Sequence, residues 1–323
     1  MPIHLVTGGA GFIGSHLVSA LVSRGARVRV LDNLVTGRRE NLAHLAVGPV
    51  GSGAPVEFLE GDITDPHAAK EACRGVTALF HEAAQVSVPQ SIQDPSRCYA
   101  INVGGTLNLL EAARASGVQR VVFAASSAAY GDTEELPKHE AMLPRPLSPY
   151  ASAKVGGEHL LSVWGHVHGL KTVSLRYFNV FGPRQVDDSP YTGVIAIFAK
   201  ALIEGRRPTI YGDGEQTRDF TYIANVVQAN LLAIEQDLPA GAVVNVGSGD
   251  RITINELFRA MADQLESSVE PRYEPARAGD VKHSVASLER ASNWLGYSPR
   301  VGWRDGLRET VDWYRQRVAS PRS

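Results

Sequence analysis

The chain has 323 residues, enough for one large α/β domain with an added lobe or for two ordinary domains. Its formal net charge of -2, with 44% hydrophobic and 20% charged residues, gives no electrostatic reason to expect a nucleic acid or a membrane as partner. Cys73 and Cys98 have neither CxxC spacing nor a histidine at zinc-ligand distance, so we expect buried thiols and no metal site. Strand-like residues begin at Ile3, and no apolar run reaches the roughly 18 residues of a membrane-spanning helix, so we expect a cytoplasmic protein.

The first half of the chain alternates short β-branched runs with longer stretches of helical periodicity. Strands are expected at residues 3–7, 27–31, 56–60, 78–81, 120–125 and 171–175. Helices are expected at residues 12–24, 66–73, 96–116 and 148–168. The glycine-rich stretch 48–55 is expected to form a surface loop. This alternation predicts an α/β fold with a doubly wound parallel sheet, the Rossmann architecture.

Beyond Asn179 the sequence becomes rich in Gly, Pro and Asp, and it ends in two helices expected at residues 254–265 and 303–318. We therefore expect residues 1–178 to form the Rossmann domain. Residues 179–323 are expected to form mainly a smaller C-terminal lobe, with segments within about 195–250 returning to the first domain.

A glycine-rich turn joins the first expected strand to the first expected helix. Gly8, Gly11 and Gly14 lie in IHLVTGGAGFIG, where bare backbone N–H groups and a helix N-terminus can meet a pyrophosphate. The next strand ends in Asp32, 18 residues beyond Gly14, which suits the ribose hydroxyls of NAD. A carboxylate at this position would repel the 2′-phosphate of NADP, so the turn predicts NAD as the cofactor.

A tyrosine and a lysine stand at i and i+4 at the start of the expected helix 148–168. Tyr150 and Lys154 therefore project from one face of that helix, which follows the strand closed by Ser126 and Ser127. Tyrosine has a solution pKa of about 10 and needs nearby positive charge to act as a base near neutral pH. Lys154 and a bound nicotinamide would both favour the phenolate, and Ser126 could align the reacting hydroxyl by hydrogen bonding.

Several motifs occur in a characteristic order along the chain: TGGAGFIG, Asp32, HEAAQ, INVGGT, SSAAYG, YASAK and LRYFNVFGPR. In this order and spacing they resemble the extended short-chain dehydrogenase/reductase family, and most closely its UDP-sugar 4-epimerases. The resemblance runs from Ile3 to about Pro299. It implies an enzyme that oxidises a UDP-hexose at C4 with NAD and then reduces the 4-keto sugar from its other face.

The resemblance also assigns roles to single residues. Ser126, Tyr150 and Lys154 would be catalytic. The contacts to NAD would come from Gly8, Gly11, Phe12, Ile13, Gly14, Asp32, Asn33, Asp62, Ile63, Ala83, Ala84, Gln85, Asn102, Tyr150, Lys154 and Tyr177. The contacts to the UDP-sugar would come from Ser87, Ser126, Ser127, Tyr150, Asn179, Val194, Tyr211, Gln216, Arg218, Arg277, Asp280 and Ser284. In this scheme Arg218 and Arg277 clamp the phosphates, because planar guanidinium donors meet phosphate oxygens bidentately.

The residues that follow Ser126 separate branches of this family. At the two positions after this serine, the 4,6-dehydratases of the family carry Asp-Glu and its decarboxylases carry a glutamate. This sequence has Ser127 and Ala128 there. Alanine cannot transfer a proton, so elimination is disfavoured and simple oxidation followed by reduction remains. Three alternatives stay open: a 4,6-dehydratase or other oxidoreductase, a UDP-glucuronate 4-epimerase, and a non-catalytic NAD-binding regulator.

Two further expectations follow from the resemblance. The small side chain of Ser284 would widen the sugar pocket, so that UDP-N-acetylglucosamine is accepted beside UDP-glucose. The helices 96–116 and 148–168 match those that pair in family dimers, so we expect a homodimer. The apolar residues available for this interface are Leu107, Leu110, Leu160 and Leu161.

Overall fold

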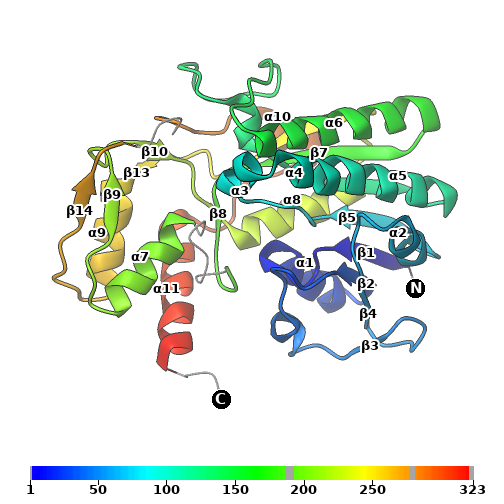
Figure 1. Cartoon of the computed structure of the whole chain (residues 1–323), viewed down its shortest axis with the longest axis horizontal. Helices are drawn as coiled ribbons and strands as arrows, with labels where there is room; N and C mark the ends of the chain where they lie inside the picture. The colour runs from blue at the N-terminus through cyan, green and yellow to red at the C-terminus, as the bar shows by residue number, and fades with distance from the viewer. Residues whose placement is uncertain (1, 186–192, 277–280, 320–323) are drawn as a thin grey trace.

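A parallel sheet of eight strands forms the centre of the molecule (Figure 1). The computed structural model describes residues 2–185, 193–276 and 281–319. From one edge of the sheet to the other, the strands are β12 (Ala242–Val246), β7 (Lys171–Tyr177), β6 (Arg120–Ser126), β5 (Ala78–His81), β1 (Ile3–Thr7), β2 (Arg27–Asp32), β4 (Val56–Glu60) and β3 (Val47–Pro49).

The six strands expected from the sequence are present, and two more extend the sheet at its edges. β3 takes up the start of the stretch expected to be a loop, which corrects that expectation for Gly48 and Pro49. Three residues are too few for a period-two pattern, and only their pairing with β4 defines them as a strand. At the other edge β12 pairs with β7, and its sequence AVVNV is buried at four of five positions.

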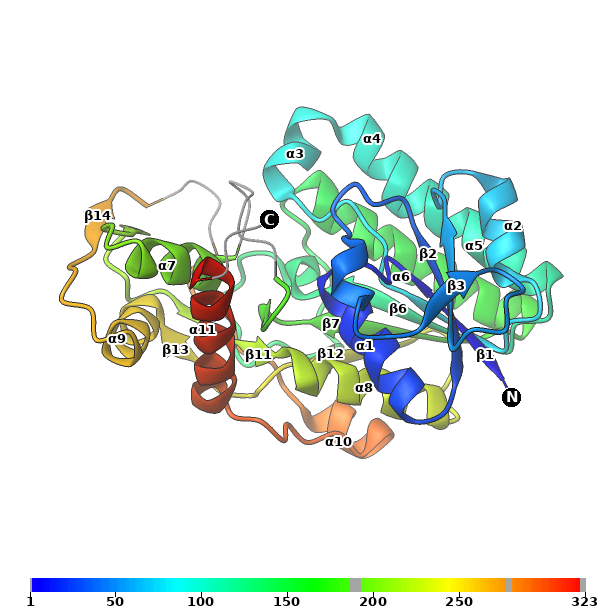
Figure 2. The same ribbon diagram turned by 90° about the horizontal axis from the view of Figure 1, so that it is seen from below.

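Helices cover both faces of this sheet (Figure 2). α1 (Phe12–Ser23) and α8 (Ile223–Glu235) pack on the face that carries Val6 and Val122. α2 (Pro66–Cys73), α5 (Thr106–Ala115) and α6 (Pro149–His168) pack on the opposite face, beside Leu5 and Phe123. Neighbouring residues of one strand therefore supply different cores, as the alternation of side chains along a strand requires.

The chain order of the strands reverses at β1. From β1 the chain builds outward through β2 to β4 on one side, and then returns to place β5, β6 and β7 on the other. The connections after β1 and β5 consequently leave in opposite directions. A crevice forms at such a point, at the carboxyl ends of the strands, where open α/β sheets bind their ligands.

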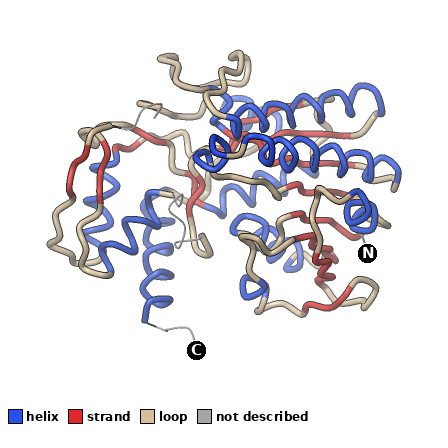
Figure 3. Tube along the Cα trace, viewed as in Figure 1, coloured by secondary structure: helices blue, strands red, loops and turns tan. Residues whose placement is uncertain are grey.

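A second lobe lies beside the sheet (Figure 3). Of the stretch 195–250, α8 and β12 lie at the sheet, whereas α7 packs against helices of the lobe. The helices of the lobe are α7 (Val194–Ile203), α9 (Ile254–Gln264) and α11 (Trp303–Ala319). Its paired strands are β9 (Thr209–Tyr211) with β14 (Arg272–Glu274), and β10 (Thr217–Arg218) with β13 (Ile252–Thr253). β8 (Val180–Phe181) pairs with β11 (Thr221–Tyr222), and α10 (Glu289–Leu295) lies next to β12.

The helix expected at residues 96–116 is divided. It begins as α4 (Pro95–Tyr99), passes through a π-helical segment, η2 (Ala100–Gly105), and continues as α5. Gly105 packs so tightly on Ile63 that an added Cβ would lie 2.6 Å from the Ile63 side chain. π-helical insertions of this kind occur frequently at functional sites. Three short elements are further additions: α3 (Val88–Gln93), η1 (Arg39–Leu42) and η3 (Ser127–Tyr130).

Two of the residues expected on the dimer surface are buried inside the protein, so that expectation is wrong for them. Leu110 and Leu161 are buried in the core beneath α5 and α6 and cannot meet a second chain. Leu107 on α5 is exposed, and so are Val163 and Val167 on α6 and Tyr99 at the end of α4. Of the helices in the described part of the chain, none has both the length and the apolar character needed to cross a membrane.

Candidate active site

The turn after β1 is closed by glycines that leave no room for side chains. Gly8 has φ +67°, and a Cβ added there would lie 2.9 Å from the backbone of Ala83 at the end of β5. A Cβ on Gly14 would collide with the carbonyl oxygen of Gly8. The turn is thus pressed against the neighbouring strand, and the first N–H groups of α1 stay bare. Backbone amides in this position form an anion site, which fits the pyrophosphate of a dinucleotide.

Asp32 ends β2 next to this turn. Its Oδ2 accepts a hydrogen bond from the N–H of Ala10, and its Oδ1 accepts one from the N–H of Leu34, both at 2.9 Å. Burial raises the pKa of Asp32 above its usual value, and the two backbone N–H groups oppose that rise. Each carboxylate oxygen keeps a further acceptor position, which a ribose hydroxyl could use. Asn33 donates to Asp62 at 2.7 Å, so these three expected cofactor residues converge at one edge of the sheet.

The connection after β5 is held by the π-helical segment. The N–H of Gln85 donates to Oδ1 of Asn102 at 2.8 Å, and Nδ2 of Asn102 donates back to the carbonyl of Gln85 at 2.9 Å. This reciprocal pair fixes the backbone of residues 83–85 against η2. The structure therefore brings Ala83, Ala84, Gln85 and Asn102 together, as the sequence predicts, and places Ile63 against the end of the same segment.

Tyr150 stands in the first turn of α6. Ser148 caps the helix by accepting from the N–H of Ala151 at 3.2 Å, and Pro149 occupies the first helical position. The N–H of Tyr150 donates to Oγ of Ser91 on α3 at 3.2 Å. Ser126, at the end of β6, lowers the pKa of the Tyr150 phenol through hydrogen bonding. Burial raises the pKa of Tyr150, so this tyrosine needs added positive charge to ionise near neutral pH.

Lys154 lies one turn further along α6 and is almost fully buried. Its Nζ donates to the carbonyl of Ala124 at 2.6 Å and lies 4.8 Å from the centre of the Phe123 ring. Burial lowers the pKa of Lys154 to about 8, against the opposing pull of Glu82, Cys98 and Glu158. The side chain of Lys154 is therefore mainly an ammonium at neutral pH. It lies in the same part of the site as Tyr150.

Three residues of this site were not predicted as functional: Glu82, Ser91 and Cys98. Glu82 follows His81 at the end of β5, and Tyr177 donates to its carboxylate at 2.9 Å. Burial raises the pKa of Glu82 to about 7. The available signal was a glutamate directly after the apolar strand ALFH. Ser91 and Cys98 lie on short helices that only the tertiary structure brings next to Tyr150 and Lys154.

The residues expected to bind the UDP-sugar lie partly in the sheet domain and partly in the second lobe. Nδ2 of Asn179 donates to the carbonyl of Asp219 at 3.0 Å, and Nε2 of Gln216 donates to the carbonyl of Tyr211 at 2.7 Å. Arg218 lies on β10, and the N–H of Ser284 donates to the carbonyl of Thr217 on the same strand at 3.1 Å. Val194 begins α7, Ser87 caps α3, and Ser127 begins η3. Arg277 and Asp280 lie outside the described residues.

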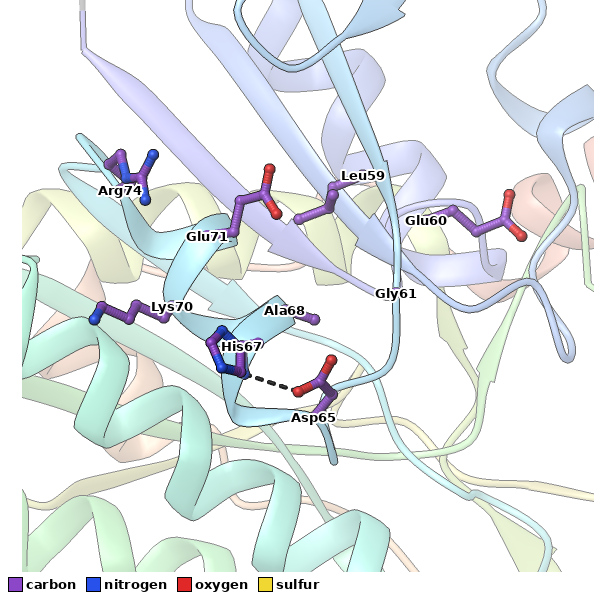
Figure 4. A pocket seen from close by; sticks show the side chains of 9 residues that line it. All are labelled: Leu59, Glu60, Gly61, Asp65, His67, Ala68, Lys70, Glu71 and Arg74. Carbon is purple, nitrogen blue, oxygen red and sulfur yellow. Dashed lines mark hydrogen bonds between the residues drawn. The ribbon is translucent and has the colours of Figure 1, made fainter.

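Another depression lies on the outside of the sheet domain, between the end of β4 and α2 (Figure 4). It is lined by residues of the segments 59–61 and 65–74, and its lining includes both acidic and basic side chains. The hydrogen bond drawn there, from the N–H of His67 to Asp65 at 2.8 Å, is the N-terminal cap of α2. Ser126, Tyr150 and Lys154 do not line this depression, so it is separate from the candidate active site.

Known proteins resemble the whole of this arrangement. Residues 4–247 match the model of the NAD dependent epimerase/dehydratase family. A UDP-glucose 4-epimerase of Mycolicibacterium smegmatis is 39% identical over 322 residues, which cover 97% of this chain and 98% of that relative.

Two solved structures extend the likeness to the fold. One is a UDP-N-acetylglucosamine 4-epimerase of Methanobrevibacter ruminantium in complex with UDP-N-acetylmuramic acid. It matches with a TM-score of 0.91 at 39% identity over 98% of both chains. The other is a UDP-glucose 4-epimerase of Thermus thermophilus in complex with NAD. It matches with a TM-score of 0.86 at 42% identity, over 97% of this chain and 99% of that chain. The likeness therefore includes both the sheet and the second lobe.

Proposed function

Because the chain belongs to the NAD dependent epimerase/dehydratase family, we propose that Ser126, Tyr150 and Lys154 carry its reaction at the carboxyl edge of the sheet. The protein is an NAD-dependent UDP-sugar 4-epimerase, an isomerase without net redox change. The observation that carries the residue assignment is the placement of Tyr150 and Lys154 one turn apart on α6, against the end of β6. Nζ of Lys154 donates there to the carbonyl of Ala124 at 2.6 Å, and Ser126 lowers the pKa of the buried Tyr150 phenol.

We assign the cofactor contacts from the bare turn and the strand ends. The N–H groups at the start of α1, next to Gly8 and Gly11, would hold the pyrophosphate, and Asp32 would accept from the adenine ribose. NAD supplies a hydride acceptor that returns the hydride to the same carbon of the sugar. The remaining contacts are assigned to Phe12, Ile13, Gly14, Asn33, Asp62, Ile63, Ala83, Ala84, Gln85, Asn102, Tyr150, Lys154 and Tyr177.

Tyr150 acts as the general base in this proposal. Its phenolate takes the proton of the C4 hydroxyl and gives a proton back when the 4-keto sugar is reduced. The hydroxyl of Ser126 aligns the reacting group. Burial raises the pKa of Tyr150, and in this proposal the ammonium of Lys154, one turn further along α6, favours the phenolate.

The absence of an acid beside Ser126 supports epimerisation over elimination. Ser127 and Ala128 begin η3 directly after β6, where the dehydratases of this family carry Asp and Glu. A side chain without an ionisable group cannot move the C5 proton. The substrate contacts are assigned to Ser87, Ser126, Ser127, Tyr150, Asn179, Val194, Tyr211, Gln216, Arg218 and Ser284, with Arg277 and Asp280 added from the sequence alone.

A direct assay tests the reaction. The purified protein is incubated separately with UDP-glucose, UDP-N-acetylglucosamine and UDP-glucuronate, and the C4 epimers are separated by chromatography. We expect galacto-configured products from the first two substrates. Formation of a 4-keto-6-deoxy sugar would support a dehydratase, and turnover of UDP-glucuronate alone would support a uronate epimerase. A protein that retains NAD but converts none of the three would fit the regulator alternative.

Substrate breadth rests on Ser284 beside β10. We expect Ser284→Tyr to depress turnover of UDP-N-acetylglucosamine at least tenfold, because the phenol ring would fill the space needed by the 2-acetamido group. A tenfold loss corresponds to roughly 1.4 kcal/mol, which is within the range for a steric change in a pocket. Turnover of UDP-glucose is expected to survive, as measured by kcat/KM for both substrates. An equal loss for the two substrates, or a wild-type protein inactive on the N-acetylated sugar, would contradict this assignment.

A homodimer is the proposed assembly. Leu107 on α5 and Val163 and Val167 on α6 are exposed, and so is Tyr99 at the end of α4. We expect dimers at micromolar concentration by sedimentation, and monomers for the double variant Leu107→Asp with Val163→Asp, because a dimer interface cannot bury like charges unpaired. Val35→Asp, at an exposed apolar position away from these helices, is the control and should stay dimeric. A monomeric wild type would refute the proposal.

The cytoplasmic location also remains a proposal, in keeping with the free thiols of Cys73 and Cys98.

A further inference from the structure

Asp219 is a buried carboxylate between β10 of the second lobe and the end of β12 in the sheet. It is completely closed off from solvent. Its Oδ1 accepts from the N–H and from the Oγ of Ser248, both at 2.7 Å. Its Oδ2 accepts from the N–H of Gly249 at 3.1 Å and from the N–H of Ala286 at 3.0 Å. A carboxylate offers about four acceptor positions, so these four uncharged donors saturate Asp219.

The donors to Asp219 belong to two segments that are distant in the sequence. Residues 247–249 follow β12 at the edge of the main sheet, whereas residues 281–287 come after β14 of the second lobe. The two segments touch at the carboxylate, because a Cβ added to Gly247 would lie 2.6 Å both from Oδ2 of Asp219 and from the Cβ of Ala286. Neither segment can move away without leaving part of a buried charge unpaired.

Three residues that we assign to the UDP-sugar are attached to this cluster. Arg218 on β10 directly precedes Asp219 in the chain. The N–H of Ser284 donates to the carbonyl of Thr217, also on β10, at 3.1 Å. Nδ2 of Asn179 donates to the backbone carbonyl of Asp219 at 3.0 Å. The positions of three residues from distant parts of the chain therefore depend on one buried residue.

The segment 281–287 also has partners other than Asp219. The N–H of Lys138 donates to the carbonyl of Val285, and the N–H of Ser287 donates to the carbonyl of Lys138, both at 2.8 Å. These bonds hold the segment from its other side. Loss of the hydrogen bond to Asp219 should therefore shift the segment relative to β10 without unfolding it.

We propose that Asp219 is a positioning residue of the UDP-sugar site. Its carboxylate holds the segment that carries Ser284, and its carbonyl holds Asn179, so that both converge with Arg218 on one ligand. This inference rests on the proposed function. Because Asp219 is buried and saturated, it acts only through these neighbours. Its loss should weaken binding of the nucleotide and leave the reaction of bound substrate largely unchanged.

Binding of UDP to Asp219→Asn tests the proposal without turnover. Asparagine keeps the size of the side chain, but its amide nitrogen cannot accept, so the bonds to one of the two oxygens are lost. We expect the Kd for UDP, measured by calorimetry in the presence of NAD, to rise roughly tenfold, the loss typical of a hydrogen bond to a charged group. The NAD content per chain should not change, because none of the four donors belongs to the glycine turn after β1.

Steady-state kinetics separate positioning from a loss of active protein. In Asp219→Asn the KM for UDP-glucose should rise together with the Kd for UDP. We expect kcat to stay within about threefold of the wild type, because the groups that react lie on β6 and α6. A merely structural role would instead lower kcat and the NAD content together.

Gly247→Ala disturbs the same cluster while the charge of Asp219 stays in place. The added methyl group must push Asp219 and Ala286 apart, so we expect a similar loss of affinity for UDP. Gly302→Ala is the matched control, because a Cβ added at this exposed position meets no atom within 4 Å. This variant should bind UDP like the wild type.

Glu57→Gln is the control for loss of a buried carboxylate. Glu57 on β4 accepts from Arg29 at 2.9 Å and from the N–H of Gly51 at 3.1 Å, within the sheet domain. We expect a lower Tm and an unchanged Kd for UDP. An effect on UDP binding equal to that of Asp219→Asn would overturn the inference, since lost stability alone would then explain both.

The remaining outcomes decide as follows. A Kd for UDP in Asp219→Asn within about threefold of the wild type overturns the inference, and so does a parallel loss of NAD. If Asp219→Asn fails to fold, the same limits apply to Gly247→Ala. A wild type that binds no UDP overturns the proposed function and this inference with it. A wild type and an Asp219→Asn variant that bind UDP equally well overturn the inference alone.

Discussion

We expect Tyr150→Phe to lower kcat by roughly 10²- to 10⁴-fold, the loss typical of removing a general base. The substitution deletes one oxygen and leaves the ring in its place at the start of α6. The hydrogen bond from the N–H of Tyr150 to Ser91 comes from the backbone and survives. Binding of NAD and of the UDP-sugar, measured by calorimetry, should therefore stay close to that of the wild type, so that the defect lies in the chemical step.

The matched control for this prediction is Tyr273→Phe. Tyr273 also uses its hydroxyl, which donates to Asn255 at 3.0 Å, but it lies on β14 in the second lobe and is largely exposed. Loss of the Tyr273 hydroxyl should change kcat by less than a factor of two to three. Its hydrogen bond lies away from the reaction, and a single hydrogen bond contributes only modestly to stability. Turnover of Tyr150→Phe within tenfold of the wild type would disprove the assignment of the base.

The largest effect on stability is expected from Arg176→Leu. Arg176 on β7 donates twice to Glu158 on α6, both side chains are buried, and its guanidinium lies 4.7 Å from the centre of the Tyr130 ring. Removing one partner leaves an uncompensated carboxylate in the core. We expect the free energy of unfolding to fall by about 3 to 5 kcal/mol, measured by urea denaturation.

A surface ion pair of the same chemistry supplies the control. Arg24 and Glu235 join α1 to α8 at 3.0 Å, and both side chains are more than half exposed. Arg24→Leu should cost less than about 1 kcal/mol, because water screens and solvates both charges. If Arg176→Leu and Arg24→Leu lowered the free energy of unfolding equally, burial of the ion pair between α6 and β7 would have no effect on the cost of breaking it.

The local elements of the sheet domain could be predicted because each carries its own signal. β1, β2 and β4 to β7 show buried runs, and α1, α2 and α6 show helical spacing with clear starts, such as Pro66 in α2 and Pro149 in α6. The spacing of Tyr150 and Lys154 on one helix, and Ser126 at the end of a strand, likewise follow from adjacent residues. Ser126 influences the pKa of the Tyr150 phenol, whereas its expected contact to the reacting hydroxyl stays a prediction.

The remaining features depend on contacts between distant segments. β12 becomes a strand of the main sheet only by pairing with β7, after the chain has passed through the second lobe. The π-helical segment η2 forms where Asn102 exchanges hydrogen bonds with Gln85 and Gly105 packs on Ile63. No periodicity in residues 96–116 encodes these partners. Leu110 and Leu161 were assigned to a surface for the same reason, since an apolar residue on a helix gives no sign of which neighbour covers it.

The position of β12 at the edge of the sheet has a consequence for synthesis on the ribosome. β7 is complete once Tyr177 has been made, but its outer edge stays without a partner until Ala242–Val246 have left the exit tunnel. During that interval the nascent chain presents an open row of N–H and C=O groups, a template for pairing with other extended chains. Release of a product truncated before β12 would leave that edge permanently open. Shortened forms of this protein should therefore aggregate even though they contain the glycine turn, Tyr150 and Lys154.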